Sequence, residues 1–328
     1  MTAFAANCNL LINYVSFFWL PATTPLWRTS IIVFVVIVLA VINLLGIRQA
    51  AIVSNVFTIG KLVPIILFIA AGLFFLNPQS YELGAAPTTG AFSQSVLLLV
   101  YAFTGFEMAT IPAGEVRNPQ RNLPRALLIA ILVVAVLYIM IQVVCVGTLP
   151  GLAQSQKPLA DAGSQFLGAA GGATISAGAI ISITGNLNIL LLSGSRLPFA
   201  MAEQRQLPTF VGSIHRQFFT PWVSILITAG LMLLLTLKSS FVAALTISTI
   251  ARLVTYGATC LALPVFRHRK EAPLAAFRLP GGSIIAILSL FLIVWLLLNA
   301  TWQEAKAAAI AAAVGLLIYC GYWLQSRR

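Results

Sequence analysis

Long apolar segments follow one another along almost the whole chain of 328 residues. A helix needs about 20 apolar residues to cross a bilayer, and the chain offers about ten candidate segments. They lie at roughly 2–20, 29–47, 53–76, 92–112, 124–147, 173–200, 221–237, 241–265, 281–299 and 305–324. Only 8% of the residues are charged, against roughly 25% in soluble domains. The chain is therefore predicted to be a polytopic membrane protein.

The fold class follows from the length of these segments. Only helices and closed barrels satisfy the backbone hydrogen bonds within lipid. The segments are long and continuous, without the alternation of a barrel strand, so an all-α bundle within a single membrane domain, 1–328, is predicted. The longest connections, 77–91 and 149–172, are rich in Gly, Pro, Ser and Gln and are expected to be solvated loops.

The net charge of +12 is explained by membrane topology, because the cations lie between the apolar segments rather than in a nucleic-acid-binding run. Thirteen lysines and arginines fall in one set of alternate loops and segment ends, and only four in the other. The first set comprises Arg48, Arg117, Arg121, Arg125, Arg196, Arg205, Arg216, Arg267, Arg269, Lys270, Arg278, Arg327 and Arg328. Cytoplasmic loops carry such an excess. Both termini are therefore predicted to be cytoplasmic, in the inner (plasma) membrane.

The sequence shows no set of residues that is typical of an enzyme active site. It contains no Ser-His-Asp set and no Gly-rich phosphate loop, and its cysteines lack metal-ligand spacing. We therefore expect no catalytic residues, no cofactor and no metal site. A channel is a weaker interpretation, because no repeat that could form a selectivity filter is present.

Three charged residues lie inside predicted spans and away from the segment ends: Lys61, Glu107 and Arg252. Such residues are costly in a membrane and usually functional. Glu107 follows Gly105 and precedes Pro112, and both of these residues weaken a helix. The span is therefore predicted to be discontinuous, with helix ends that could face a substrate. The alternative is a kinked helix whose Glu107 pairs with an internal arginine or hydroxyl.

The other two residues leave their roles open. Lys61, in "TIGKLVP", could extend its amine to the membrane interface. Arg252, in "STIARLVTYG", could pair with Glu107, face a cavity or close the cytoplasmic pathway.

Several motifs together resemble the amino acid–polyamine–organocation (APC) superfamily of permeases. "AFTGFE…GEVRNPQRNLPRAL" resembles the sixth helix and the loop after it. "NLLGIRQAAIVSNVFTIGKLVPIILFIAAGLFFL" resembles helices four and five, and "GNLNILLLSGSRLPFAMAEQRQLP" resembles helix eight. "HRQFFTPWVSILIT" resembles the entry to helix nine. The resemblance covers the chain from about Arg28 onward.

The resemblance implies two inverted five-helix repeats followed by two further helices, with residues 92–265 as the complete second repeat. It implies secondary active transport of amino acids or related amines by alternating access, proton-coupled or exchanging. The residues that it places at the substrate are Phe103, Thr104, Gly105, Phe106 and Glu107, with Asn186 and Asn188 nearby. The two asparagines could instead form interhelical hydrogen bonds.

The resemblance also implies a role for Lys61. It matches a helix-five lysine that, in proton-coupled members, takes the place of a sodium ion. Burial disfavours the charged form of an amine, so such a lysine can exchange a proton, and the proton is the expected coupling ion.

The chain departs from the family at its beginning. Helices one and two, with the Gly-rich unwound motif of the first, have no counterpart, and residues 2–20 resemble the end of the third. A misassigned start, a truncated gene or a second chain would explain this. The alternative function is a non-transporting remnant or a partner subunit of a permease, and the chain alone is expected to transport little.

Overall fold

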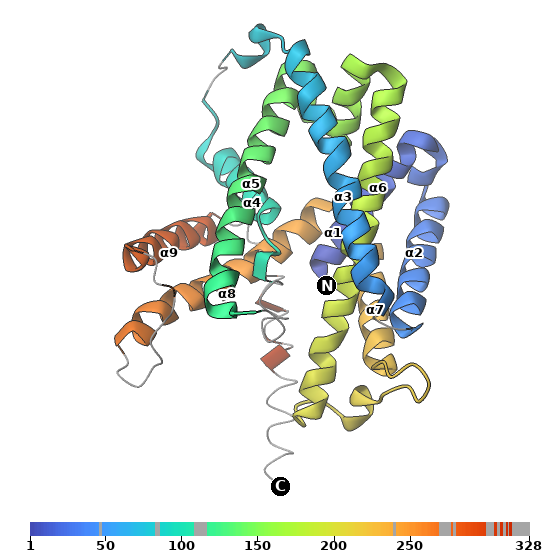
Figure 1. Ribbon diagram of the computed structural model, residues 1–328, viewed down its shortest axis with the longest axis vertical. Coiled ribbons are helices and arrows are strands. Elements are labelled where there is room, and N and C mark those ends of the chain that lie inside the picture. The colour runs from blue at the N-terminus through green and yellow to red at the C-terminus, as the bar shows by residue number, and fades with distance from the viewer. Residues whose placement is uncertain are drawn as a thin grey trace. The chain divides into compact units, whose positions relative to one another are not determined.

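The computed structural model describes residues 1–45, 48–82, 86–107, 117–238, 241–268, 277 and 280–299, with scattered positions between 305 and 316. These residues form helices and turns, without a strand. The helices are α1 (Thr2–Phe18), α2 (Pro25–Leu45), α3 (Arg48–Gly72), α4 (Thr89–Ala102), α5 (Pro119–Thr148), α6 (Pro158–Glu203), α7 (Trp222–Lys238), α8 (Phe241–His268) and α9 (Gly282–Leu298) (Figure 1).

The all-α prediction is confirmed, and a helix lies in each of the first nine predicted ranges. The tenth range, 305–324, lies mostly outside the described residues, so the total number of spans stays a prediction. The helices α2, α5 and α6, together with residues Ala244–Arg267 of α8, are long and apolar enough to cross a membrane.

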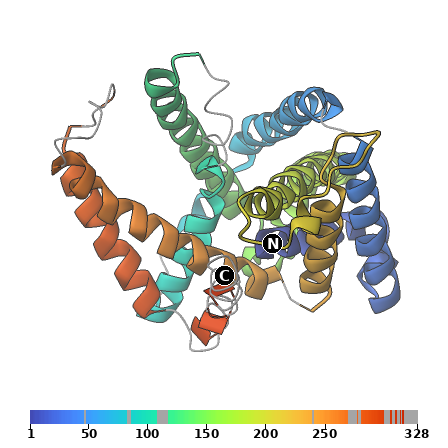
Figure 2. The ribbon, with the colours of Figure 1, turned by 90° about the horizontal axis from the view of Figure 1, so that it is seen from below.

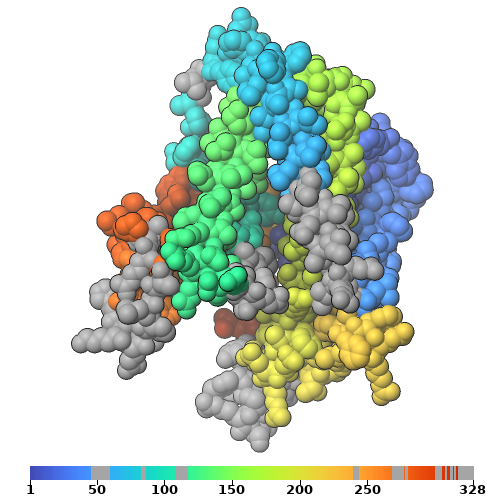
Figure 3. Space-filling view, in the orientation of Figure 1, coloured from blue at the N-terminus to red at the C-terminus, as the bar shows by residue number. Residues whose placement is uncertain are grey.

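Helix α5 shows the surface expected of a lipid-facing helix. Its side chains at Ile129, Leu132 and Ile139 are 63%, 67% and 62% exposed. In Figure 3 the helix forms a continuous green column on the face in view. A continuous apolar surface of this length is unfavourable in water, so this side of α5 is suited to contact lipid.

The chain forms two compact units. The first comprises Met1–Leu83, Met140–Ala244 and Ala312–Arg328, and the second comprises Gly84–Ile139 and Leu245–Ala311. Helices α1, α2, α3, α6 and α7 belong to the first unit, and α4 and α9 to the second, while α5 and α8 each contribute to both.

In the first unit, α6 packs against α1, α2, α3 and α7. Its backbone leaves the helical conformation at Gly168 (φ 65°, ψ −164°), so α6 consists of two helical parts. The prediction of a solvated loop over 149–172 is therefore wrong from Pro158 onward, where Ala160 and Ala162 are fully buried. Small residues allow close helix packing as readily as they allow loops, and tertiary packing decides between the two.

In the second unit, one apolar cluster joins three helices. Leu97 of α4, Leu253 of α8, and Ile293 and Leu296 of α9 form its buried centre. Figure 2 shows α8 and α9 side by side, as this cluster requires. The cluster holds the last turns of α4 against the middle of α8, which is where the candidate site lies.

Candidate functional site

Helix α4 stops inside the predicted fourth span, and residues 103–105 form a turn. The rest of that span, from residue 108, lies outside the described residues, so a second helical half stays a prediction. Helix α4 ends at Ala102, and the N–H of Phe103 donates to the carbonyl oxygens of Leu99 and Val100. Gly105 then has φ +108°, a backbone conformation that L side chains rarely adopt. The glycine therefore permits the turn. Pro112, the second predicted weak point, lies outside the described residues.

The end of α4 is capped by protein groups. The hydroxyl of Thr104 donates to the carbonyl oxygen of Tyr101 at 2.7 Å. The hydroxyl of Tyr138, on α5, donates to the carbonyl oxygen of Ala102 at 3.1 Å. A helix end leaves its last carbonyls without helical partners, and these two bonds supply partners within the second unit.

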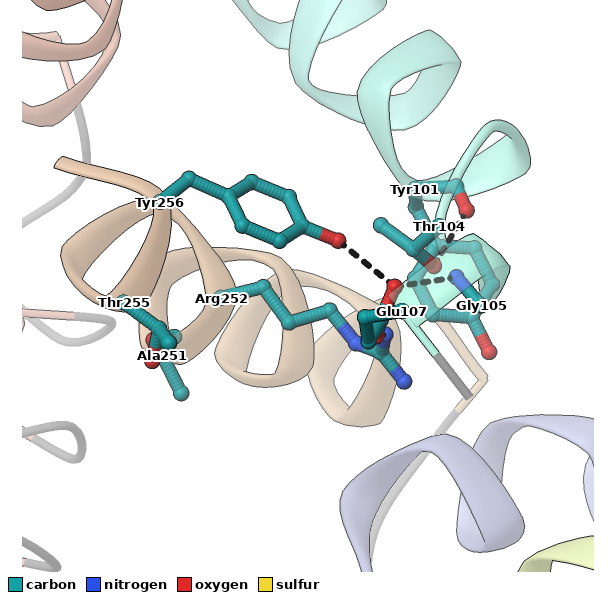
Figure 4. Close-up of polar contacts among 8 residues, drawn as sticks. All are labelled: Tyr101, Thr104, Gly105, Glu107, Ala251, Arg252, Thr255 and Tyr256. Atoms are coloured by element: carbon teal, nitrogen blue, oxygen red, sulfur yellow. Dashed lines mark hydrogen bonds and ion pairs between the residues drawn. The ribbon is translucent and has the colours of Figure 1, made fainter. Parts of the chain in front are cut away.

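Glu107 is held from three sides (Figure 4). Its Oε2 accepts a hydrogen bond from the N–H of Gly105 at 2.9 Å and another from the hydroxyl of Tyr256 at 3.0 Å. Its Oε1 forms an ion pair with Arg252. Of the three roles left open for Arg252, the structure shows pairing with Glu107. These are the contacts of the kinked-helix interpretation, and a substrate role for Glu107 stays a prediction.

Tyr256 is a member of this site that the sequence did not reveal. It follows Arg252 by four residues, so both side chains lie on one face of α8. Its ring stacks on that of Phe106 with centroids 5.7 Å apart and an interplanar angle of 26°. The four-residue spacing between Arg252 and Tyr256 was the available signal in the sequence. It points to Tyr256 only once Arg252 is known to face α4.

The two phenylalanines of the predicted site contact different helices. The ring of Phe103 packs edge-on against Tyr138 of α5, with centroids 5.3 Å apart. Phe106 lies on Tyr256 of α8. The turn at 103–107 is therefore fixed to both α5 and α8, and its side chains do not converge on one point.

Asn186 and Asn188, on α6, belong to the first unit, whereas residues 103–107 belong to the second. The amide of Asn186 donates to Oδ1 of Asn7 at 3.3 Å. The amide of Asn43 donates to Oδ1 of Asn188 at 2.8 Å. Both asparagines thus form the interhelical hydrogen bonds of the alternative interpretation, and their substrate role stays a prediction.

Lys61 lies on α3 and is partly buried. Among the described residues, none forms a hydrogen bond or an ion pair with its amine. The helix that carries it packs along α6. A partly buried amine without a protein partner can interact with an ion or a proton, and its coupling role stays a prediction.

An apolar helical chain with an ion pair beside the end of α4 fits the class of polytopic membrane transporters. The sequence profile of the amino acid permease family matches residues 1–319. The chain belongs to this family, which confirms the resemblance to APC superfamily permeases. It is a multi-pass membrane protein of a transporter family and not an enzyme.

Three relatives come from Bacillus subtilis (strain 168). The serine/threonine exchanger SteT is 29% identical, over 87% of this chain and 67% of its own length. The methylthioribose transporter is 29% identical, over 86% and 61%. The branched-chain amino acid permease BcaP is 27% identical, over 89% and 63%. The chain thus spans about two thirds of the length of these relatives.

Proposed function

We propose that this protein takes part in secondary active transport of amino acids or related amines by alternating access. The observation that carries the proposal is the capped break at the end of α4, with Glu107 held at it, in a member of the amino acid permease family. Two of the relatives, SteT and BcaP, are named for amino acid transport. A break in a spanning helix is where transporters of this kind bind substrate.

The substrate-binding residues under this proposal are Phe103, Thr104, Gly105, Phe106 and Glu107, with Asn186 and Asn188 as further contacts. The first five lie in one short turn whose backbone is interrupted at Gly105. The two asparagines already bond to Asn7 and Asn43, so a substrate would share or replace those bonds.

The transport cycle is proposed to be proton-coupled or exchanging. Lys61 supports proton coupling, because its partly buried amine has no protein partner among the described residues. The relative named as an exchanger supports the second mode. Both termini are proposed to be cytoplasmic in the plasma (inner) membrane, on the distribution of lysine and arginine.

The test is uptake of labelled L-serine and L-leucine by proteoliposomes. It uses the chain as given and the chain extended by any in-frame upstream coding sequence, since the relatives are longer. Accumulation in either form supports the proposal. Absence of uptake, exchange and binding from both forms contradicts it and favours a non-transporting component.

A matched pair of variants tests the site. Glu107→Gln breaks the ion pair with Arg252 and is expected to abolish uptake while the protein still reaches the membrane. Glu203→Gln, at the exposed end of α6, removes an acid away from the break and should transport normally. Equal uptake by both variants would remove Glu107 from the site.

A further inference from the structure

The charges at the break in α4 are opposite in sign and directly paired. Glu107 is the one acidic side chain within an apolar span in the described part of the chain, since Glu82, Asp161 and Glu203 lie in connections or at helix ends. Both of its carboxylate oxygens have partners: Gly105 and Tyr256 at Oε2, and Arg252 at Oε1. A cationic substrate would therefore meet an acid that already has a counter-ion.

The same pairing applies to the cation. The Arg252 guanidinium is bound to Glu107, so an anionic substrate meets a cation that is already neutralised. Two opposite charges in contact act on a third group as a dipole, whose effect falls with distance much faster than that of a single charge. The pair therefore gives the break polarity without a net charge.

The pair is reachable and fixed in place. The side chains of Glu107 and Arg252 are 31% and 18% exposed, so neither is sealed inside the unit. Tyr256 holds the carboxylate through its hydroxyl and stacks on Phe106. Leu253, next to Arg252, belongs to the buried cluster that joins α4, α8 and α9. The arrangement resists rotation of either charged side chain towards a ligand.

We propose that the Glu107–Arg252 pair selects substrates by charge: it restricts the site to amino acids whose side chain is uncharged. The inference rests on the proposed function and narrows its substrate class, from amino acids and related amines to zwitterions without a further charge. Removing Arg252 would leave the carboxylate of Glu107 to attract cations. Removing Glu107 would leave the guanidinium to attract anions.

The experiment measures binding rather than turnover, so that a variant that binds but does not transport still reports. Purified protein in lipid nanodiscs is titrated with two nearly isosteric pairs, L-norleucine with L-lysine and L-glutamine with L-glutamate. The variants are Arg252→Gln, Glu107→Gln and the double variant. Arg267→Gln is the matched control. Arg267 lies on α8 like Arg252, but near the C-terminal end of that helix, where it donates a hydrogen bond to Ser283.

In the wild type, each neutral ligand is expected to bind about tenfold or more tightly than its charged partner, since an uncompensated charge in a site is costly. Arg252→Gln should shift the lysine-to-norleucine affinity ratio about tenfold towards lysine. Glu107→Gln should shift the glutamate-to-glutamine ratio towards glutamate by a similar factor. The double variant should restore preference for the neutral ligands, and Arg267→Gln should retain it.

Two results overturn the inference while leaving the proposed function intact. One is a wild type that binds L-lysine or L-glutamate as tightly as the neutral partner. The other is that both single variants weaken the binding of all ligands equally, which would show that the Glu107–Arg252 pair has a purely structural role. If a single variant does not fold, the wild-type ratios and the other variants still decide. A wild type that binds no amino acid contradicts the proposed function itself, and the inference with it.

Discussion

The hydroxyl of Tyr138 donates a hydrogen bond to the carbonyl oxygen of Ala102, the last residue of α4, at 3.1 Å. The bond ties α5 to the point where α4 stops. It also supplies a partner to a carbonyl that has none within its own helix. The break is therefore not an open helix end but one closed by a neighbouring helix.

Tyr138→Phe removes this bond and keeps the ring that packs on Phe103. A loss of about 1 kcal/mol in unfolding free energy is expected, together with slower uptake, because the carbonyl of Ala102 is freed beside the proposed site. Thermal unfolding in detergent and initial uptake rates measure the two effects.

Tyr81→Phe is the matched control. The hydroxyl of Tyr81 donates to the carbonyl oxygen of Val143, also on α5, at 2.7 Å. The Tyr81→Phe variant should lose about as much unfolding free energy as Tyr138→Phe, but its uptake rate per folded molecule should equal that of the wild type. Equal uptake by the two variants would show that the cap at Ala102 has no bearing on transport.

Gly105→Ala should reduce uptake through the backbone alone. Among the described residues other than its chain neighbours, no heavy atom lies within 4 Å of a Cβ added at Gly105, so the substitution meets no crowding from them. Its φ of +108° is costly for any L residue, by about 1–3 kcal/mol. The turn would relax and move the N–H that binds Glu107. Uptake and thermal stability are both expected to fall.

Gly90→Ala provides the comparison on the same helix. Gly90 lies in the first turn of α4, has no positive φ, and would place an added Cβ more than 4 Å from the described residues beyond its neighbours. Alanine is favoured over glycine in a helix by about 1 kcal/mol, so this variant should be as stable as the wild type or more so. If both glycine variants behave alike, backbone strain at Gly105 is not what shapes the site.

The sequence was sufficient to place a turn at Gly105, and insufficient to identify the side chains that bond to the end of α4. Gly105 marks the turn because few other residues accept its φ, and that information is local. The pairing of Glu107 with Arg252, and the bond from Tyr138, join segments far apart in the chain. Hydropathy and spacing leave such contacts undetermined, so three roles for Arg252 were equally compatible with the residues alone.

The first part of α6 is a helix that composition alone did not predict. The Gly, Pro, Ser and Gln content of 149–172 favoured a loop, yet residues from Pro158 form a helix with Ala160 and Ala162 fully buried. Glycines lower the helix propensity of a segment, while small side chains permit close approach of helices. Such a segment is decided by the surface against which it packs, which a single sequence does not give.

The hydrogen bond between Asn43 and Asn188 should appear as a coupling energy. In a double-mutant cycle with Asn43→Ala and Asn188→Ala, a coupling of about 0.6 kcal/mol is expected, with about 1.7 as the upper end for such bonds in membranes. Asn7 and Asn186 form the control pair, and their longer distance of 3.3 Å predicts a smaller coupling.

Ligand binding by the same variants separates packing from recognition. If Asn188 contacts substrate, Asn188→Ala should weaken amino acid binding beyond its effect on stability, whereas Asn43→Ala should not. Parallel losses in both variants would assign Asn188 to helix packing alone.

Lys61→Ala tests the proposed coupling ion. The lysine lies on α3, partly buried, and its amine has no hydrogen bond or ion pair among the described residues. Since removing the amine breaks no hydrogen bond or ion pair among the described residues, the free energy of unfolding should change little. Accumulation of amino acid driven by an inward proton gradient should be lost, because the proposed proton-carrying group is gone. Exchange of internal for external substrate needs no proton step and should persist.

Lys238→Ala is the control, because Lys238 is exposed at the end of α7. It should keep both gradient-driven accumulation and exchange. Undiminished accumulation by Lys61→Ala would rule out the coupling role and leave exchange as the mode of transport. Loss of both activities without loss of folded protein would instead place Lys61 in the machinery that changes conformation, since proton coupling alone cannot explain a failure to exchange.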